Sequence, residues 1–163
     1  MRHVKTTDQT PVSAERQIAG FIARFEPNTQ KLIRSVRKVL RKRFPTANEL
    51  VYDYRKNFVI GYSPEEYGSA AIVAMTADVG GIRLIFNQGP SLPDPHKLLL
   101  GDGGQTRFIP VESAKVLQRP EVESLMTAAV RKARIPLRRS GRGELIIKSM
   151  SWKKKPARNT VNR

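Results

Sequence analysis

The chain has 163 residues, no cysteine and a formal net charge of +16 at pH 7. A chain of this length usually forms one domain, and the lack of cysteine excludes disulfide bonds, thiolate metal ligands and cysteine nucleophiles. The longest apolar stretch, residues 70–75, is far shorter than the roughly 20 residues that span a bilayer. We therefore expect one domain over residues 1–150, no signal peptide, no membrane span and a cytoplasmic location.

The first part of the chain predicts two helices. Residues 11–25 begin with Pro11, which the first turn of a helix tolerates, and carry apolar side chains at helical spacing. Pro27 ends this helix, and a second one follows as far as Pro45, with Asn28 or Thr29 as its cap. The apolar residues of the second helix recur at roughly 100° per residue, which places them on one face.

The opposite face of the second helix is basic. It carries Lys31, Arg34, Arg37, Lys38, Arg41 and Lys42, whereas Arg43 falls within the apolar arc. The helix has no acid to pair with these cations, and like charges four residues apart destabilise a helix slightly. Two interpretations stay open. The face is either an ordinary solvated surface or an anion-binding surface, to which we assign Arg34, Arg37, Lys38 and Arg41.

The middle of the chain predicts β structure. β-branched and aromatic residues predict strands at 49–54 and 58–62 with a turn between them, and a second pair at 69–77 and 82–86. In the last of these, Ile82, Leu84 and Phe86 alternate with Arg83, which is typical of a strand with one buried face. A connection rich in Pro and Gly follows, with a short helical piece at 95–100 and a short strand at 106–111.

A third helix begins at Pro120 and ends before Pro136. Acids in its first turn and bases at its end, Arg134 among them, complement the helix dipole. A basic link then leads to a last strand at 145–150, and residues 151–163 form a basic tail that we expect to be flexible. Two helices, several strands and one helix in this order predict an α+β fold rather than the alternating units of a nucleotide-binding fold.

The positive charge is concentrated in two segments. Residues 131–163 hold twelve Lys and Arg and one acid, residues 28–48 hold seven Lys and Arg and no acid, and the remainder is nearly neutral. Such asymmetry is typical of proteins that bind phosphates or an anionic surface. The alternative is that the charge only favours solubility.

The sequence contains none of the common catalytic or zinc-binding motifs. His3 and His96 stand alone, and the glycine-rich run at 101–104 lacks the Lys-Ser or Lys-Thr of a phosphate-binding loop. We therefore assign no catalytic residue, no metal ligand and no cofactor, and we expect a binding protein rather than an enzyme.

Asp53 is the acid that most needs an explanation, because it lies within a strand between Tyr52 and Tyr54. It can face solvent, pair with an arginine or line a pocket, and we favour pairing or a strand-edge position over catalysis. As a second hypothesis, Tyr52 and Asp53 line a ligand pocket together with Gln88 and Arg107.

Several segments carry a family resemblance. They are VYDY at 51–54, VIGYSP at 59–64, FNQG at 86–89, LPDP at 92–95, LLGDG at 99–103, RFI at 107–109 and LIIKS at 145–149. In order and spacing they resemble the YdhG-like family of bacterial domains of unknown function, over roughly residues 14–158. The resemblance implies an α+β fold with two N-terminal helices and a later helix packed on a mainly antiparallel sheet.

Some members of the wider family look like frataxin-type iron chaperones, which bind iron through surface carboxylates. The acids of this chain are dispersed, which departs from that requirement. Family members also tend to carry a lysine where Gly104 stands, so we do not expect an anion site in that loop.

Two functions from different classes result. The first is a non-enzymatic binding protein with a basic surface for nucleic acid or another polyanion, in which Lys148, Lys153, Lys154 and Lys155 join the second helix and Trp152 stacks on bases. The second is an iron or small-ligand chaperone. The oligomeric state, and whether the two basic segments form one surface, stay open.

Overall fold

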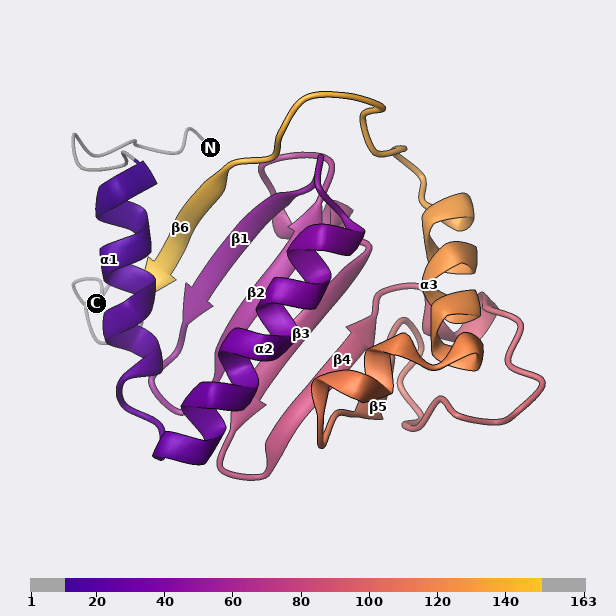
Figure 1. Cartoon of the computed structure of the whole chain (residues 1–163). Helices are drawn as coiled ribbons and strands as arrows, with labels where there is room; N and C mark the ends of the chain where they lie inside the picture. Colours follow the sequence, from indigo (N-terminus) through magenta and orange to yellow (C-terminus); the bar gives the residue numbers. More distant parts are fainter. Residues whose placement is uncertain (1–10, 151–163) are drawn as a thin grey trace, which may run out of the picture.

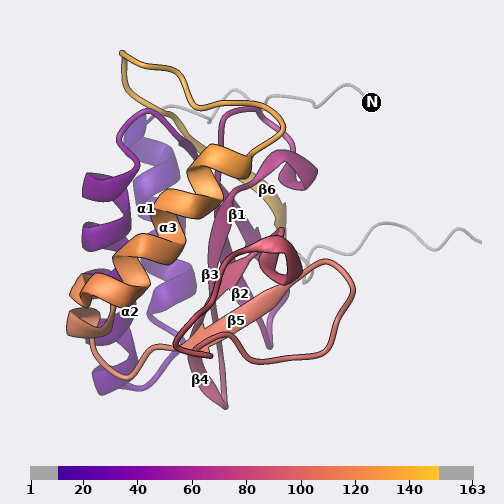
Figure 2. The ribbon, with the colours of Figure 1, turned by 90° about the vertical axis from the view of Figure 1, so that its right-hand side faces the viewer.

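The computed structural model of the protein describes residues 11–150 and has a six-stranded sheet at its centre, in the order β5-β4-β3-β2-β1-β6. The strands are β1 (Asn48–Asp53), β2 (Phe58–Ser63), β3 (Val73–Asp78), β4 (Gly81–Phe86), β5 (Arg107–Pro110) and β6 (Leu145–Met150). Neighbouring strands are antiparallel except β6, which runs parallel to β1. Helices α1 (Pro11–Ile22), α2 (Pro27–Arg43) and α3 (Pro120–Lys132) lie on one side of the sheet (Figures 1 and 2), which confirms the predicted α+β fold.

The alternation of side chains along the strands decides which face the helices cover. A row of buried residues crosses the sheet from Val51 through Ile60, Met75 and Leu84 to Ile109, each paired with the next. On the opposite face Thr76 is half-buried and Arg83 is exposed, whereas Leu50 and Ala74 are buried. The prediction of one buried face for β4 is therefore correct.

The two N-terminal helices form where their apolar periodicity predicts them, but their ends differ from the prediction. α1 ends at Ile22 rather than near residue 25. Pro27 is the first residue of α2, where its fixed φ angle suits a helix start, and the residue before the helix is Glu26. Asn28 and Thr29 therefore lie within the first turn of α2, and the prediction that one of them is the cap was wrong.

The connection between β4 and β5 also differs from the prediction. Residues 95–100 form no helix; instead Asp94 accepts backbone hydrogen bonds from Leu98 and Leu99, both at 2.9 Å, and Leu100 forms an isolated β-bridge with Phe108. Elsewhere in residues 11–150 the chain forms three short 3₁₀ helices, η1 (Gly68–Ala70), η2 (Gly89–Ser91) and η3 (Ala114–Gln118). Because η1 occupies residues predicted as strand, β3 begins only at Val73.

Asn48 and Gly143 position β6 beside β1. The side-chain oxygen of Asn48 accepts a hydrogen bond from the Glu144 backbone at 2.9 Å, and the backbone nitrogen of Gly143 donates to Pro45 at 3.0 Å. Gly143 passes so close to Ala47 that a Cβ atom on it would lie 1.7 Å from the Ala47 carbonyl oxygen. The approach of β6 to the sheet therefore requires glycine at this position. Within residues 11–150, no helix combines the length and the apolar character that crossing a membrane demands.

Candidate functional site

Arg37, which we predicted to face an anionic partner, instead joins three elements of the fold. Its guanidinium donates two hydrogen bonds to Glu49 of β1, at 3.0 and 2.9 Å, and two to Glu15 of α1, both at 3.0 Å. The Tyr62 hydroxyl of β2 donates to the same Glu49 carboxylate at 2.9 Å. The Arg37 side chain is only 11 % exposed and that of Glu49 only 6 %. Arg37 therefore stabilises the packing of the helices on the sheet.

Burial and the neighbouring charges shift the pKa values of three groups in this cluster, Arg37, Tyr62 and Glu15. Burial disfavours the charged form of Arg37, but hydrogen bonds and charges from Glu49 and Glu15 outweigh it and raise the pKa of the guanidinium. Burial, with the Glu49 charge as a second cause, raises the pKa of Tyr62 well above its ordinary value. The hydrogen bond from Arg37 lowers the pKa of Glu15, which is about half exposed.

Acid should weaken this cluster through Glu15. Because its folded-state pKa lies below the ordinary value of 4.5, the stability that Glu15 contributes is present above that pH and is lost as the pH falls through the folded-state pKa. The difference in free energy of unfolding between wild type and Glu15→Gln should thus be positive at neutral pH and shrink on acidification. Urea unfolding of both proteins across that range measures it, and a difference independent of pH would contradict the assignment.

The remaining cations of α2 divide into two groups. Arg43 pairs with Glu123 of α3 at 2.5 Å, and Arg41 lies 3.6 Å from both Glu15 and Glu49. The helix itself has no acid, but acids of other elements therefore pair with three of its cations, Arg37, Arg41 and Arg43. The other four are exposed and make no salt bridge with any residue from 11 to 150; we call Lys31, Arg34, Lys38 and Lys42 the α2 stripe.

Lys148 does not extend this stripe. It follows Ile147, which packs into the core under the helices, and it lies where the register between β6 and β1 shifts. There its ammonium group donates to the Glu66 carbonyl at 2.7 Å. Lys153, Lys154, Lys155 and Trp152 lie outside the described residues. The described part of the C-terminal basic segment is therefore divided: Arg131 and Lys132 end α3, on the same side of the sheet as α2, whereas Lys148 lies in β6 and contacts Glu66.

The four residues of the predicted ligand pocket do not converge. Asp53 is fully buried at one end of β1 and forms an ion pair with Arg24, which confirms the pairing that we favoured. Tyr52 lies on the other face and stacks on Tyr54, with ring centroids 5.9 Å apart. The strand register places Gln88 at the opposite end of the sheet from Asp53, since Gln88 follows Phe86.

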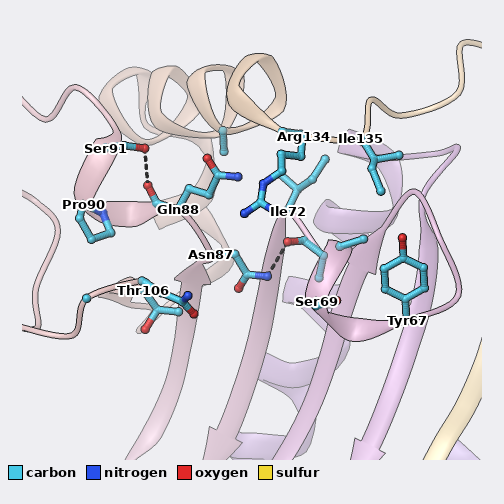
Figure 3. A pocket seen from close by; sticks show the side chains of 16 residues that line it. Tyr67, Ser69, Ile72, Asn87, Gln88, Pro90, Ser91, Thr106, Arg134 and Ile135 are labelled. Carbon is cyan, nitrogen blue, oxygen red and sulfur yellow. Dashed lines mark hydrogen bonds between the residues drawn. The ribbon is translucent and has the colours of Figure 1, made fainter.

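A cavity of about 690 Å³ is present at the Gln88 end of the sheet (Figure 3). Its walls are η1, η2, residues 104–106 and the end of α3 with the residues that follow it; we call it the Arg134 cavity after its charged side chain. Gln88 is the one predicted pocket residue that lines it. Arg107 does not line it, but its guanidinium donates to the carbonyls of Gly103 and, at 2.9 Å, Thr106, and so holds one wall in place.

The described residues, 11–150, offer no cluster of side chains that could serve as metal ligands. Among residues 11–150, no three His, Cys, Asp or Glu side chains come together in a way that could hold a metal ion.

Comparison of the chain with protein-family models, with curated proteins and with solved structures found no match.

Proposed function

We propose that the protein is a non-enzymatic binding protein for nucleic acid, which it contacts through the α2 stripe. One observation carries the proposal: four exposed cations follow one another along a single helix face, and none has an acidic partner among the residues that the structure describes. Their positions, three or four residues apart, align them on the outer face of α2. At about 1.5 Å rise per residue, the stripe from Lys31 to Lys42 is roughly 16 Å long.

The chemistry of this surface favours phosphate contacts over base recognition. α2 contains no aromatic residue, so the stripe offers no platform for base stacking. Lysine and arginine contacts to phosphates give affinity that depends on salt and little on sequence. We therefore expect similar affinity for unrelated duplexes of equal length.

Neutralising the stripe should weaken nucleic-acid binding and its salt dependence together. For Lys31, Arg34, Lys38 and Lys42 changed to Gln, the slope of log affinity against log salt should fall by about 0.9 for each phosphate that the protein no longer neutralises. Fluorescence anisotropy with a labelled duplex, starting at about 50 mM salt, measures both quantities.

A matched control removes the same charge elsewhere. Lys56, Lys115, Arg131 and Lys132 are exposed and lie outside α2, so changing them to Gln lowers the net charge equally. The control should bind more tightly than the stripe variant. Equal losses in both variants, or no binding by the wild type, would overturn the proposal.

The resemblance to the YdhG-like family remains a prediction, and the two chaperone alternatives differ in support. No observation in the described part of the chain favours iron, because its acids form no cluster. A small-ligand function has a specific observation behind it, the Arg134 cavity.

A further inference from the structure

The Arg134 cavity has a charge that nothing in its walls compensates. Arg134 is the one charged residue among those that line it, and no Asp or Glu contributes to the described walls. Figure 3 shows the Arg134 side chain reaching from the end of α3 into the cavity, toward the side where Gln88 and Asn87 lie. Within residues 11–150 its guanidinium forms neither a hydrogen bond nor an ion pair.

An unpaired guanidinium at this position suits one class of ligand group. It presents five N–H donors in a planar fork, which matches the two oxygens of a carboxylate or phosphate. The C-terminal end of α3 carries partial negative charge, which by itself would repel an anion. Arg134 is therefore the group on which binding of an anion would depend.

The walls beside Arg134 are held in place by contacts of their own. Asn87 donates its side-chain amide to the Ala71 carbonyl, and the Ser91 hydroxyl donates to the Gln88 carbonyl at 2.9 Å. Gly89 packs so tightly that a Cβ atom on it would lie 2.5 Å from the Cβ of Arg107. The floor of the cavity is thus formed before any ligand arrives, which lowers the entropic cost of binding.

The remaining surface of the cavity suits the uncharged part of a ligand whose anionic group binds Arg134. Ile72, Ala129 and Ala133 supply apolar wall, while the Gln88 side-chain amide makes no hydrogen bond within the described chain. The volume of about 690 Å³ lies within the roughly 300–1,000 Å³ typical of small-molecule sites.

We propose that the Arg134 cavity binds a small molecule that carries a carboxylate or phosphate on an uncharged, partly apolar body no larger than a mononucleotide. Arg134 binds the anionic group, and Gln88 donates to or accepts from the body. This site is separate from the α2 stripe and does not depend on it.

Two acidic probes and their neutral counterparts test the proposal on the full chain by isothermal titration calorimetry. AMP carries a phosphate on adenosine and benzoate carries a carboxylate on a phenyl ring, and adenosine and benzamide are the uncharged counterparts. At least one acid should bind, about 10- to 100-fold more tightly than its neutral counterpart, as expected for charge-assisted hydrogen bonds. Which acid binds identifies the anionic group.

Variants assign the effect to the cavity. Arg134→Gln should reduce the affinity of the acid to that of its neutral counterpart, and Arg134→Lys should fall between, because lysine keeps the charge without the fork. Arg131→Gln removes an exposed base on α3 that does not line the cavity, and it should bind as the wild type does. Since Arg134 is exposed and unpaired within the described chain, its variants should unfold at the same temperature as the wild type.

The results separate this site from the proposed nucleic-acid surface. The variant without the α2 stripe should bind the acid normally, and Arg134→Gln should keep its affinity for duplex. Binding of neither acid, equal binding of an acid and its neutral counterpart, or unchanged binding in Arg134→Gln would overturn the proposal of an anion site in this cavity.

Discussion

Changing Gly143 to alanine is expected to destabilise the protein by about 3 kcal/mol, because the added Cβ cannot be accommodated without moving β6. The atoms it would meet are the carbonyl oxygen and carbon of Ala47, at 1.7 and 2.3 Å, and backbone atoms cannot rotate away as a side chain can. If residue 143 retreats instead, it gives up the hydrogen bond to Pro45 and the one that Asn48 accepts from Glu144. Both hydrogen bonds position β6 beside β1.

Urea unfolding measures this loss, and hydrogen exchange should show the amides of β6 less protected than in the wild type, with those of β2 and β3 changed less. Gly20→Ala is the matched control, because Gly20 lies within α1 and a Cβ there would have no atom within 4 Å. Alanine should stabilise the helix at that position by about 0.5–1 kcal/mol. A Gly143→Ala protein as stable as the wild type would contradict the close approach of residue 143 to Ala47.

The second large effect is expected for Glu49→Gln, which removes the charge that Arg37 faces inside the fold. The change leaves a buried guanidinium without its ion-pair partner on β1, and breaking such a pair from one side costs about 3 kcal/mol. Glu15 cannot replace the missing carboxylate, because it already accepts two hydrogen bonds from Arg37 and is half exposed. Thermal and urea unfolding give the change in free energy.

Two further proteins show whether the loss comes from the unpaired charge. Glu112→Gln makes the same chemical change at an exposed position and should alter stability by less than about 0.5 kcal/mol. The double variant Arg37→Met, Glu49→Leu removes both charges and should be more stable than Glu49→Gln alone. A Glu49→Gln protein as stable as Glu112→Gln would show that the Arg37 cluster contributes little to stability.

Local sequence patterns predicted most helices and strands of this fold, but they did not predict contacts between residues that are distant in the sequence. Apolar spacing placed α2 and the alternation in β4 correctly, because each depends on the neighbours of a residue in the chain. The strand at 145–150 was also predicted, but its parallel pairing with β1 was not. That pairing depends on Asn48 and Gly143, which lie far apart in the sequence. Neither residue, taken alone, indicates which strand β6 pairs with.

In the candidate site, too, the sequence did not predict the contacts between distant residues. A helical wheel places Arg37 on the outer face of α2, but it takes no account of a long side chain that reaches Glu49 on a strand. Asp53 and Gln88 were grouped as polar residues of one pocket, and only the strand register reveals that they lie at opposite ends of the sheet. From the sequence, Arg134 was interpreted only as a cation at the end of a helix. That it lines the same cavity as Gln88 depends on how α3 packs, which the sequence pattern does not reveal.

The parallel pairing of β6 with β1 also has a consequence for how the chain folds as it is synthesised. Asn48 and Glu144, which fix the start of that pairing, are 96 residues apart. At about 5–20 residues per second, roughly 5–20 s pass between their incorporation. During that interval the β1–β4 strands can pair with one another, but one edge of β1 keeps its backbone N–H and C=O groups unpaired and open to other chains. The nascent protein is therefore most prone to edge-to-edge aggregation until residues 145–150 arrive to cover β1.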